Sequence, residues 1–385
     1  MRRACRSCAQ IAALLAFAAL GIVLCGCGGS GGPIALPSLA SSGSGAPTTV
    51  GPNTLGAARA AAAPLVDGND ADAAWASAPE LALTEPAVTL RALYTATDLY
   101  VLAVVPDATA SFARRAWIWD GTTWKTLQGQ SEDRLAIMWN IAAPNFDRVG
   151  CLVKCHPGTH DPAGEDDAWL ETGKADMWHM KAARYLPNAG ISQSGALSIE
   201  ATTHAVTAGT VTFSGWADDK WIGQWSAANA PDGGRYGDAG AGAETRNRSA
   251  DKTAPNYVET APLDFVDAMT LYQTEIDNGE AAQVAGLSAA QRQAAWDRYV
   301  ALKAAVPERI LRTPAGSRAD VQQAGIWRDG TWTLEYRRAL DTGRPEEDVI
   351  FNDLNAKYPF GVAWMDNTDG AEHIPSRLLS LVFLP

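Results

Sequence analysis

The feature that most constrains the fold of this chain is a series of short apolar segments with two-residue periodicity, separated by turn signals. Residues 88–94 alternate in this way, Thr97 and Asp98 fit a turn, and residues 99–105 follow as a second, more fully buried strand. Alternation of this kind is typical of half-buried β-strands. An Asp-Gly dipeptide lies between aromatic runs at residues 120–121 and again at 329–330, as in tight hairpins. The pattern predicts a mainly β protein built from hairpins.

Further strands are predicted over residues 133–139, 360–364 and 378–384, on either side of a long middle with little regular pattern. Residues 186–256 in this middle are rich in Gly, Asn and Asp and are expected to be mostly irregular. A helix is predicted to begin at the capping box from Ser288 to Gln291. We therefore expect an antiparallel β-sandwich with a large irregular or helical insertion that forms a cofactor pocket.

The first 26 residues are typical of an export signal. Three arginines form a basic start, and residues 11–24 form an apolar run that is short for a membrane span of about 20 residues. Cys27 follows small Gly26, as in a lipobox, so we expect cleavage after residue 26 and lipidation of Cys27. A periplasmic lipoprotein is expected, and Gly28 indicates the outer membrane; a soluble periplasmic protein cut nearby is the alternative.

Residues 27–64 consist mostly of Gly, Ser, Ala, Pro and Thr and are expected to form a flexible tether, followed by one folded domain over residues 65–385. The net charge of −12 argues against nucleic-acid binding. Three of the six cysteines lie in the expected leader, so too few remain for a disulfide scaffold. The catalytic motifs of hydrolases, zinc proteases and nucleotide-binding enzymes do not occur.

The strongest chemical motif is a pair of thiols followed directly by an imidazole: Cys151, Cys155 and His156. The order is that of a c-type haem attachment site, with one residue more between the thiols than the usual C-x-x-C-H. In such a site the thiols add to the haem vinyl groups and the His is an axial iron ligand. A local disulfide and a zinc site with His156 and His160 are the alternatives.

A second segment follows about one loop later and offers three candidates for the sixth ligand: His179, Met180 and Lys181. In a helix, His179 and Lys181 would point about 200° apart, whereas in a strand they would share a face. Met138 is a further candidate ligand or a core residue. Arg184 is expected either to neutralise a haem propionate or to be a solvated end of its element. We expect His156 and His179 to be the two axial ligands.

Several segments, in this order, carry a family resemblance. They are Asp67-Gly68 with Trp75, and residues 132–139, 151–156, 176–184, 217–221, 314–320, 332–335 and 340–343, with His373. The chain resembles the haem-binding domain shared by the gamma subunits of ethylbenzene dehydrogenase and related dimethylsulfoxide-reductase-type enzymes, and its c-type-cytochrome-like relatives. The resemblance implies a β-sandwich that binds one haem and passes electrons in the periplasm.

Two departures from the family pattern affect the expected site. Relatives that serve molybdenum enzymes hold a non-covalent haem through Met and Lys, whereas this chain has the Cys pair. Met180 stands where the commoner form of the motif has Trp. We therefore expect one covalent haem c, or haem b if the Cys pair is not used.

The expected function is electron transfer to a periplasmic redox partner or to oxidoreductase subunits, without catalysis by the chain itself. A carbohydrate- or ligand-binding module without a redox role is the alternative, with Trp117, Trp119, Trp124 and Trp221 as candidate contacts. A haem enzyme or sensor with an open sixth position is a third hypothesis.

Overall fold

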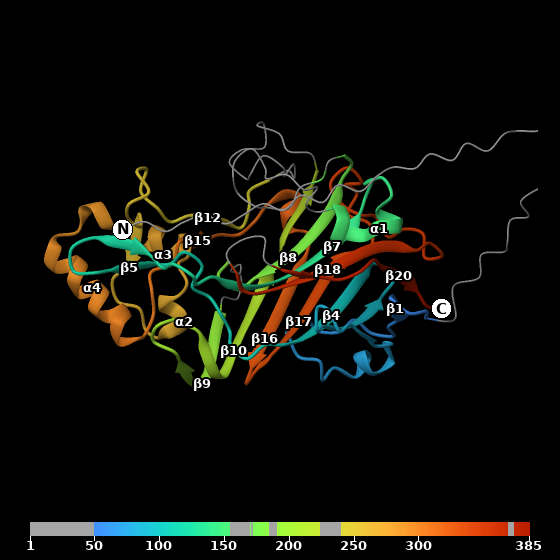
Figure 1. The fold of residues 1–385 in the computed structure, drawn as a ribbon, viewed down its shortest axis with the longest axis horizontal. Coiled ribbons are helices and arrows are strands. Elements are labelled where there is room, and N and C mark those ends of the chain that lie inside the picture. The colour runs from blue at the N-terminus through green and yellow to red at the C-terminus, as the bar shows by residue number, and fades with distance from the viewer. Residues whose placement is uncertain (1–49, 155–169, 171, 185–190, 224–239, 369–372) are drawn as a thin grey trace, which may run out of the picture. The chain divides into compact units, whose positions relative to one another are not determined.

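A computed structural model describes residues 50–154, 170, 172–184, 191–223, 240–368 and 373–385 of the chain. The described part is mainly β, as expected, and one large sheet runs through it (Figure 1). The strands on the main path of this sheet are β1 (Thr54–Arg59), β3 (Thr89–Tyr94), β4 (Asp98–Pro106), β7 (Glu132–Asn140), β8 (Ala175–Lys181), β9 (Ile191–Ile199), β10 (Val206–Trp216), β11 (Asp218–Ile222), β16 (Gln322–Arg328), β17 (Thr331–Ala339), β18 (Tyr358–Thr368) and β20 (Leu379–Phe383).

The strand order along this path is β11-β8-β7-β18-β20-β1-β3-β4-β17-β16-β10-β9, and short β2 (Leu81–Ala82) and β19 (Ile374–Pro375) pair with β3 and β18. The sheet is mixed and not purely antiparallel, because β1 runs parallel to both β20 and β3. Such pairs join strands that are distant in sequence, so the periodicity of one segment cannot show them.

The two halves of the sheet pack face to face. Trp332 on β17 donates its indole N–H to Asp133 on β7 at 3.2 Å, although five strands separate β17 from β7 in the sheet order. Arg338, also on β17, binds Asp176 on β8 at 2.6 Å. Large side chains from both halves, among them Trp139 and Trp332, belong to one buried apolar cluster. This arrangement confirms the predicted sandwich.

The local signals were interpreted correctly. Asp329 and Gly330 both have positive φ, 42° and 92°, as a hairpin turn between β16 and β17 requires. The second Asp-Gly pair joins β5 (Trp117–Trp119) to β6 (Trp124–Thr126). The capping box starts α4 (Ala289–Ala301), with Gln291 N donating to the Ser288 hydroxyl at 3.3 Å.

Two expectations were wrong. The folded part begins at β1, inside the expected tether, and Leu55 and Ala57 of this strand are fully buried. The small residues of β1 resemble a linker in composition, but they suit a strand enclosed between two neighbours. β9 and β10 form one edge of the sheet within the stretch that was expected to be irregular. Gly and small polar residues interrupt the apolar alternation along both strands, so their sequence did not predict them.

An insertion between β11 and β16 combines helices with short strand pairs. It contains the pair β12 (Glu244–Arg246) and β15 (Arg309–Leu311), and the pair β13 (Tyr257–Glu259) and β14 (Ala281–Gln283). Its other elements are α2 (Phe265–Ala268), α3 (Gln273–Asn278), α4 and the short turns η3 (Val284–Gly286) and η4 (Gly316–Ala319); η1 (Ala73–Ser77) lies earlier in the chain. No helix in the described ranges is long and apolar enough to cross a membrane.

Candidate functional site

The segment with the candidate ligands is a strand, β8, and this decides which side chains lie together. His179 and Lys181 alternate with Trp178 and Met180, which belong to the core cluster between the two layers. Successive side chains of a strand point to opposite faces. His179 and Lys181 therefore lie on the outer face of the sheet, and Met180 lies on the inner face, in the core. We remove Met180 from the candidate ligands for that reason.

His179 is the most distinctive residue of the outer face. Its side chain is 7% exposed, and its Nε2 atom has no hydrogen-bond partner within the described part of the chain. Burial, with Lys181 and Arg134 nearby, lowers the pKa of the imidazole well below its ordinary value. The ring is therefore neutral at pH 7 and keeps a lone pair that can bind a metal.

The strands beside β8 place small and apolar groups around His179. Ala136 of β7 and Asp218 of β11 lie directly opposite it, and Met138 is opposite Met177 two pairs further along β7. Met138, Met177 and Ala136 belong to an apolar cluster that also contains Phe146, Leu170 and Met365. Met138 thus lies on the same face as His179, diagonal to it, and stays a candidate ligand.

The other side of His179 is strongly polar. Lys181 Nζ is bonded to the Asp218 carboxylate, and Lys220 and Arg318 reach the same carboxylate at 2.6 and 3.2 Å. Burial alone would raise the pKa of Asp218, but these three cations hold it well below its usual range. In this arrangement the Lys181 amine is committed to an ion pair, whereas the His179 nitrogen is not.

The cysteine segment approaches the same face. Helix α1 (Phe146–Lys154) packs against β7 and β18, and its Phe146 belongs to the apolar cluster around Met138. The helix breaks at Gly150, where φ is 63° and a Cβ would come within 3.0 Å of the Leu378 backbone. This break directly precedes Cys151, whose backbone is in the second part of α1. Cys155, His156 and Cys27 lie outside the described residues.

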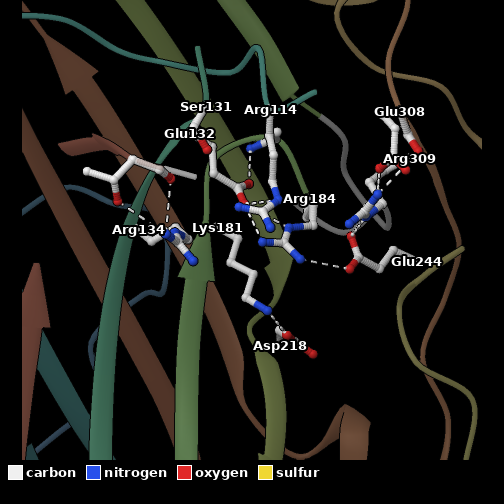
Figure 2. Close-up of polar contacts among 12 residues, drawn as sticks. Arg114, Ser131, Glu132, Arg134, Lys181, Arg184, Asp218, Glu244, Glu308 and Arg309 are labelled. Carbon is white, nitrogen blue, oxygen red and sulfur yellow. Dashed lines mark hydrogen bonds and ion pairs between the residues drawn. The ribbon is translucent and has the colours of Figure 1, made fainter. Parts of the chain in front are cut away.

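Arg184 lies in a buried network of ion pairs and not at a solvated end of its element, while its contact with a haem propionate stays a prediction. Figure 2 shows its guanidinium between Glu132 and Glu244. The side chain is only 9% exposed, so a solvated position is wrong. Arg309 extends the chain of charges from Glu244 to Glu308. Arg184 thus links β7 to the β12–β15 pair of the insertion, and two carboxylates already balance its charge.

The segments that carry the family resemblance are joined by buried polar contacts. Glu335 on β17 accepts hydrogen bonds from the backbone N–H of Asp67 and Gly68, at 2.9 and 2.8 Å, and from the Trp75 indole at 2.7 Å. Asp176 of the β8 segment binds Arg338 of β17. These motif residues therefore have a structural role, in contrast to the candidate ligand residues of the outer face.

Three residues of the site were missed from the sequence: Arg134, Lys220 and Arg318. Arg134 lies opposite Lys181 across β7 and β8 and donates to the Thr368 carbonyl at 3.0 Å. Lys220 follows Asp219, which lies on the inner face of β11. The alternation of a strand could therefore have placed Lys220 on the outer face from the sequence alone. Arg318 lies in η4, far along the chain, and only the tertiary structure brings it to Asp218.

The outer face suits a flat, amphipathic cofactor with two acidic groups. It offers an apolar part with two methionines, a neutral imidazole with an unpartnered nitrogen, and a basic part around Lys181, Lys220 and Arg318. Nitrogen and thioether are the usual axial donors for haem iron in electron carriers. The residues present therefore fit a haem.

The comparisons with known proteins support the family assignment. No curated protein matches the chain. The family model described as ethylbenzene dehydrogenase matches residues 58–374, which include most strands of the sandwich, α1 and the insertion. This range contains the outer face with His179 and the cysteine segment. The chain belongs to the ethylbenzene dehydrogenase family.

Proposed function

We propose that this chain is an exported, lipid-anchored haem protein that transfers electrons between periplasmic or outer-membrane partners. The family membership supports a role related to ethylbenzene dehydrogenase-like oxidoreductases. The absence of the common catalytic motifs from the sequence favours an electron carrier or haem-binding subunit over a catalyst. A haem supplies reversible one-electron chemistry, and its axial ligands and burial set the potential.

The proposed site lies on the outer face of β7, β8 and β11. Cys151 and Cys155 would hold the haem covalently, and His156 would be the proximal ligand because it directly follows an anchored thiol. His179 is proposed as the sixth ligand, with Met138 and Lys181 as rivals. Lys220 and Arg318, which are both beside Asp218, are proposed as the cations that would pair with the haem propionates.

The observation that carries the proposal is the state of His179. Among the 22 buried side-chain polar atoms without a hydrogen-bond partner in the described part of the chain, His179 Nε2 is the one imidazole nitrogen, an atom type that binds haem iron. It belongs to a neutral ring on the face against which α1 packs. Lys181, the ligand type of the non-covalent relatives, is instead bonded to Asp218. The structure thus favours His179 over Lys181.

The first experiment tests covalent attachment. The chain, produced in a host that matures c-type cytochromes, should give a haem spectrum and a peroxidase-stained band on a denaturing gel. The double variant Cys151→Ser, Cys155→Ser should lose the band. A haem spectrum without a stained band would mean haem b and would overturn the covalent part alone. No haem spectrum at all in the wild type would refute the proposed function.

The second experiment tests the sixth ligand. His179→Ala should convert the six-coordinate ferric spectrum to a high-spin or ligand-exchanged form and allow carbon monoxide to bind the reduced protein. His204→Ala is the matched control, because His204 is also buried but its Nδ1 is already bonded to the Lys303 carbonyl at 2.8 Å. If Lys181→Ala or Met138→Ala changes the spectrum and His179→Ala does not, the His assignment is wrong.

A further inference from the structure

Three carboxylates meet in the insertion, at a place that the proposed haem site does not use. They belong to Glu259 of β13, Asp267 of α2 and Glu275 of α3, and one oxygen of each lies within 4.8 Å of the others. Helices α2 and α3 lie at one end of the fold, away from β7, β8 and α1 (Figure 1). The three acidic groups thus come from three separate elements of the insertion.

Glu259 is the most buried of the three. It is 8% exposed, and its Oε2 atom has no hydrogen-bond partner in the part of the chain that the structure describes. A carboxylate oxygen that loses its hydration without gaining a partner is unfavourable. Since the Glu259 carboxylate is turned toward Asp267 and Glu275, a group that satisfies it has to lie between three acids.

The protein does not balance the negative charge of this cluster. None of the three carboxylates forms a salt bridge with another described residue. Arg298, whose charge acts on Glu259, donates instead to the carbonyls of Pro262 and Leu263 at 2.7 and 3.0 Å. Burial, together with the neighbouring acids, raises the pKa of Glu259 to about 8 and that of Glu275 to about 7. The cluster therefore has to bind either protons or a cation.

Backbone N–H groups hold two of the carboxylates in place. Asp267 Oδ2 accepts from Leu263 N, and Glu275 Oε2 accepts from Tyr272 N, each at 2.7 Å. An ionised carboxylate offers about four lone-pair sites, so both groups can still coordinate an ion. Asp267 and Glu275 are only half-buried, so solvent and ions reach the cluster on their side.

The spacing of the oxygens suits calcium. The centre of a triangle with sides of 4.8 Å is about 2.8 Å from each corner, close to the Ca–O distances of about 2.3–2.6 Å and further from the about 2.0–2.1 Å of Mg²⁺. An ion at this centre would contact the Glu259 oxygen from inside the cluster. It therefore needs no water-accessible surface on that oxygen, unlike a ligand that binds from outside.

We propose that Glu259, Asp267 and Glu275 bind one calcium ion, which links β13 to α2 and α3. Water molecules would complete the six to eight oxygen ligands that calcium takes. The expected affinity rests on the proposed export of the chain, since extracellular modules bind calcium with dissociation constants of about 10⁻⁴–10⁻³ M. Binding should release protons from the cluster, so the affinity should rise with pH.

The test uses the full chain, freed of metal with EDTA and then dialysed, and calcium chloride as the probe. At pH 8, calcium chloride at about 10 mM should raise the melting temperature by about 5 °C, and calorimetric titration should give a dissociation constant on the order of 10⁻⁴ M. Magnesium chloride at the same concentration should raise the melting temperature clearly less.

Glu259→Gln keeps the shape of the side chain and removes its charge. It should weaken calcium binding at least about 10-fold, because the charge of the ligands sets the affinity, and it should not lower the melting temperature in EDTA. Glu280→Gln is the matched control: exposed Glu280 adds negative charge near Glu259 but is not one of the three ligands. It should change the dissociation constant less than about 3-fold.

Three outcomes would overturn the proposal. The first is no calcium binding at pH 8 by a protein whose circular dichroism shows that it is folded, which would mean that the cluster holds protons. The second is calcium binding that Glu259→Gln and Asp267→Asn leave unchanged. The third is equal stabilisation by magnesium and calcium, which would indicate general screening of the net charge of −12. Each outcome is independent of whether the chain holds haem.

Discussion

Arg338 is the residue whose loss should damage the fold most. It lies on β17, is 1% exposed, and its Nη1 is 2.6 Å from Asp176 Oδ2 and 3.8 Å from Asp348 Oδ1. Oxygens of Asp176, Asp219 and Asp348 lie within 4.8 Å of one another, and all three residues are buried. One guanidinium thus opposes a group of three carboxyls between the two layers of the sandwich.

We predict that Arg338→Met lowers the free energy of unfolding by about 3–5 kcal/mol, the usual loss when one partner of a buried ion pair is removed. Methionine keeps an apolar stem beside Trp178 and Phe351, whose rings lie 5.0 Å from the guanidinium carbon. The loss of stability should therefore come mainly from the buried carboxyls that no longer face a positive charge. The free energy of unfolding of a typical domain is about 5–15 kcal/mol, so the predicted loss is a large fraction of it.

The sign of the pH dependence follows from the same carboxyls. Burial raises the pKa of Asp348 to about 7 and also raises that of Asp176, even beside Arg338. A folded-state pKa above the unfolded value means that the folded protein binds protons more tightly, so stability falls as pH rises through that range. The deficit of Arg338→Met should consequently be smaller at pH 5 than at pH 8.

The assay is urea unfolding of the wild type and the variant at both pH values, followed by tryptophan fluorescence. Arg91→Met is the matched control, because Arg91 pairs with Glu80 at 2.9 Å with side chains 32% and 50% exposed. Exposed pairs contribute about 0–1 kcal/mol. Adding Asp176→Asn to Arg338→Met should recover part of the loss. A deficit at pH 8 no larger than that of Arg91→Met would refute the reasoning.

Three further predictions concern other parts of the chain. Burial, assisted by the nearby Asp366 carboxylate, raises the pKa of Asp107 to about 6, so Asp107→Asn should stabilise the protein by up to about 3 kcal/mol above pH 6 and have little effect below pH 4 in urea titrations. Gly68→Ala should lower the melting temperature more than Gly121→Ala: both have positive φ, but only at Gly68 would a Cβ meet backbone, at 2.6 Å. Cys27→Ala should abolish metabolic palmitate labelling, and retained label would place the lipidation site elsewhere.

The sequence alone determined the local structure and the class of fold. The Asp-Gly turn between β16 and β17 and the capping box of α4 depend on residues within about four positions of one another, so the sequence identified both. Alternation along β17 predicted a strand with one face on the core, and the continuous apolar run of β4 predicted a strand that is buried on both faces. The family match confirms the ethylbenzene dehydrogenase family that the order of the motifs indicated, whereas the gamma-subunit type and the c-type haem stay predictions.

The position of the candidate ligands depended on the tertiary structure. The motif around His179 is compatible with a helix or a strand, and its pairing with β7 and β11 makes it a strand. That choice put His179 and Lys181 on one face and Met180 on the other. Burial and the ion pair with Asp218 then distinguished the two candidates.

The long-range contacts could not be obtained from the sequence for one physical reason. Arg338 meets Asp176 across 162 positions, and Glu335 meets Gly68 across 267. Parallel β1 joins β20 and β3 in the same way, at a distance in sequence that no local pattern encodes. Local propensity acts through neighbouring residues, whereas these pairs are selected by burial, because a charged or polar group inside the sandwich is stable only beside its partner.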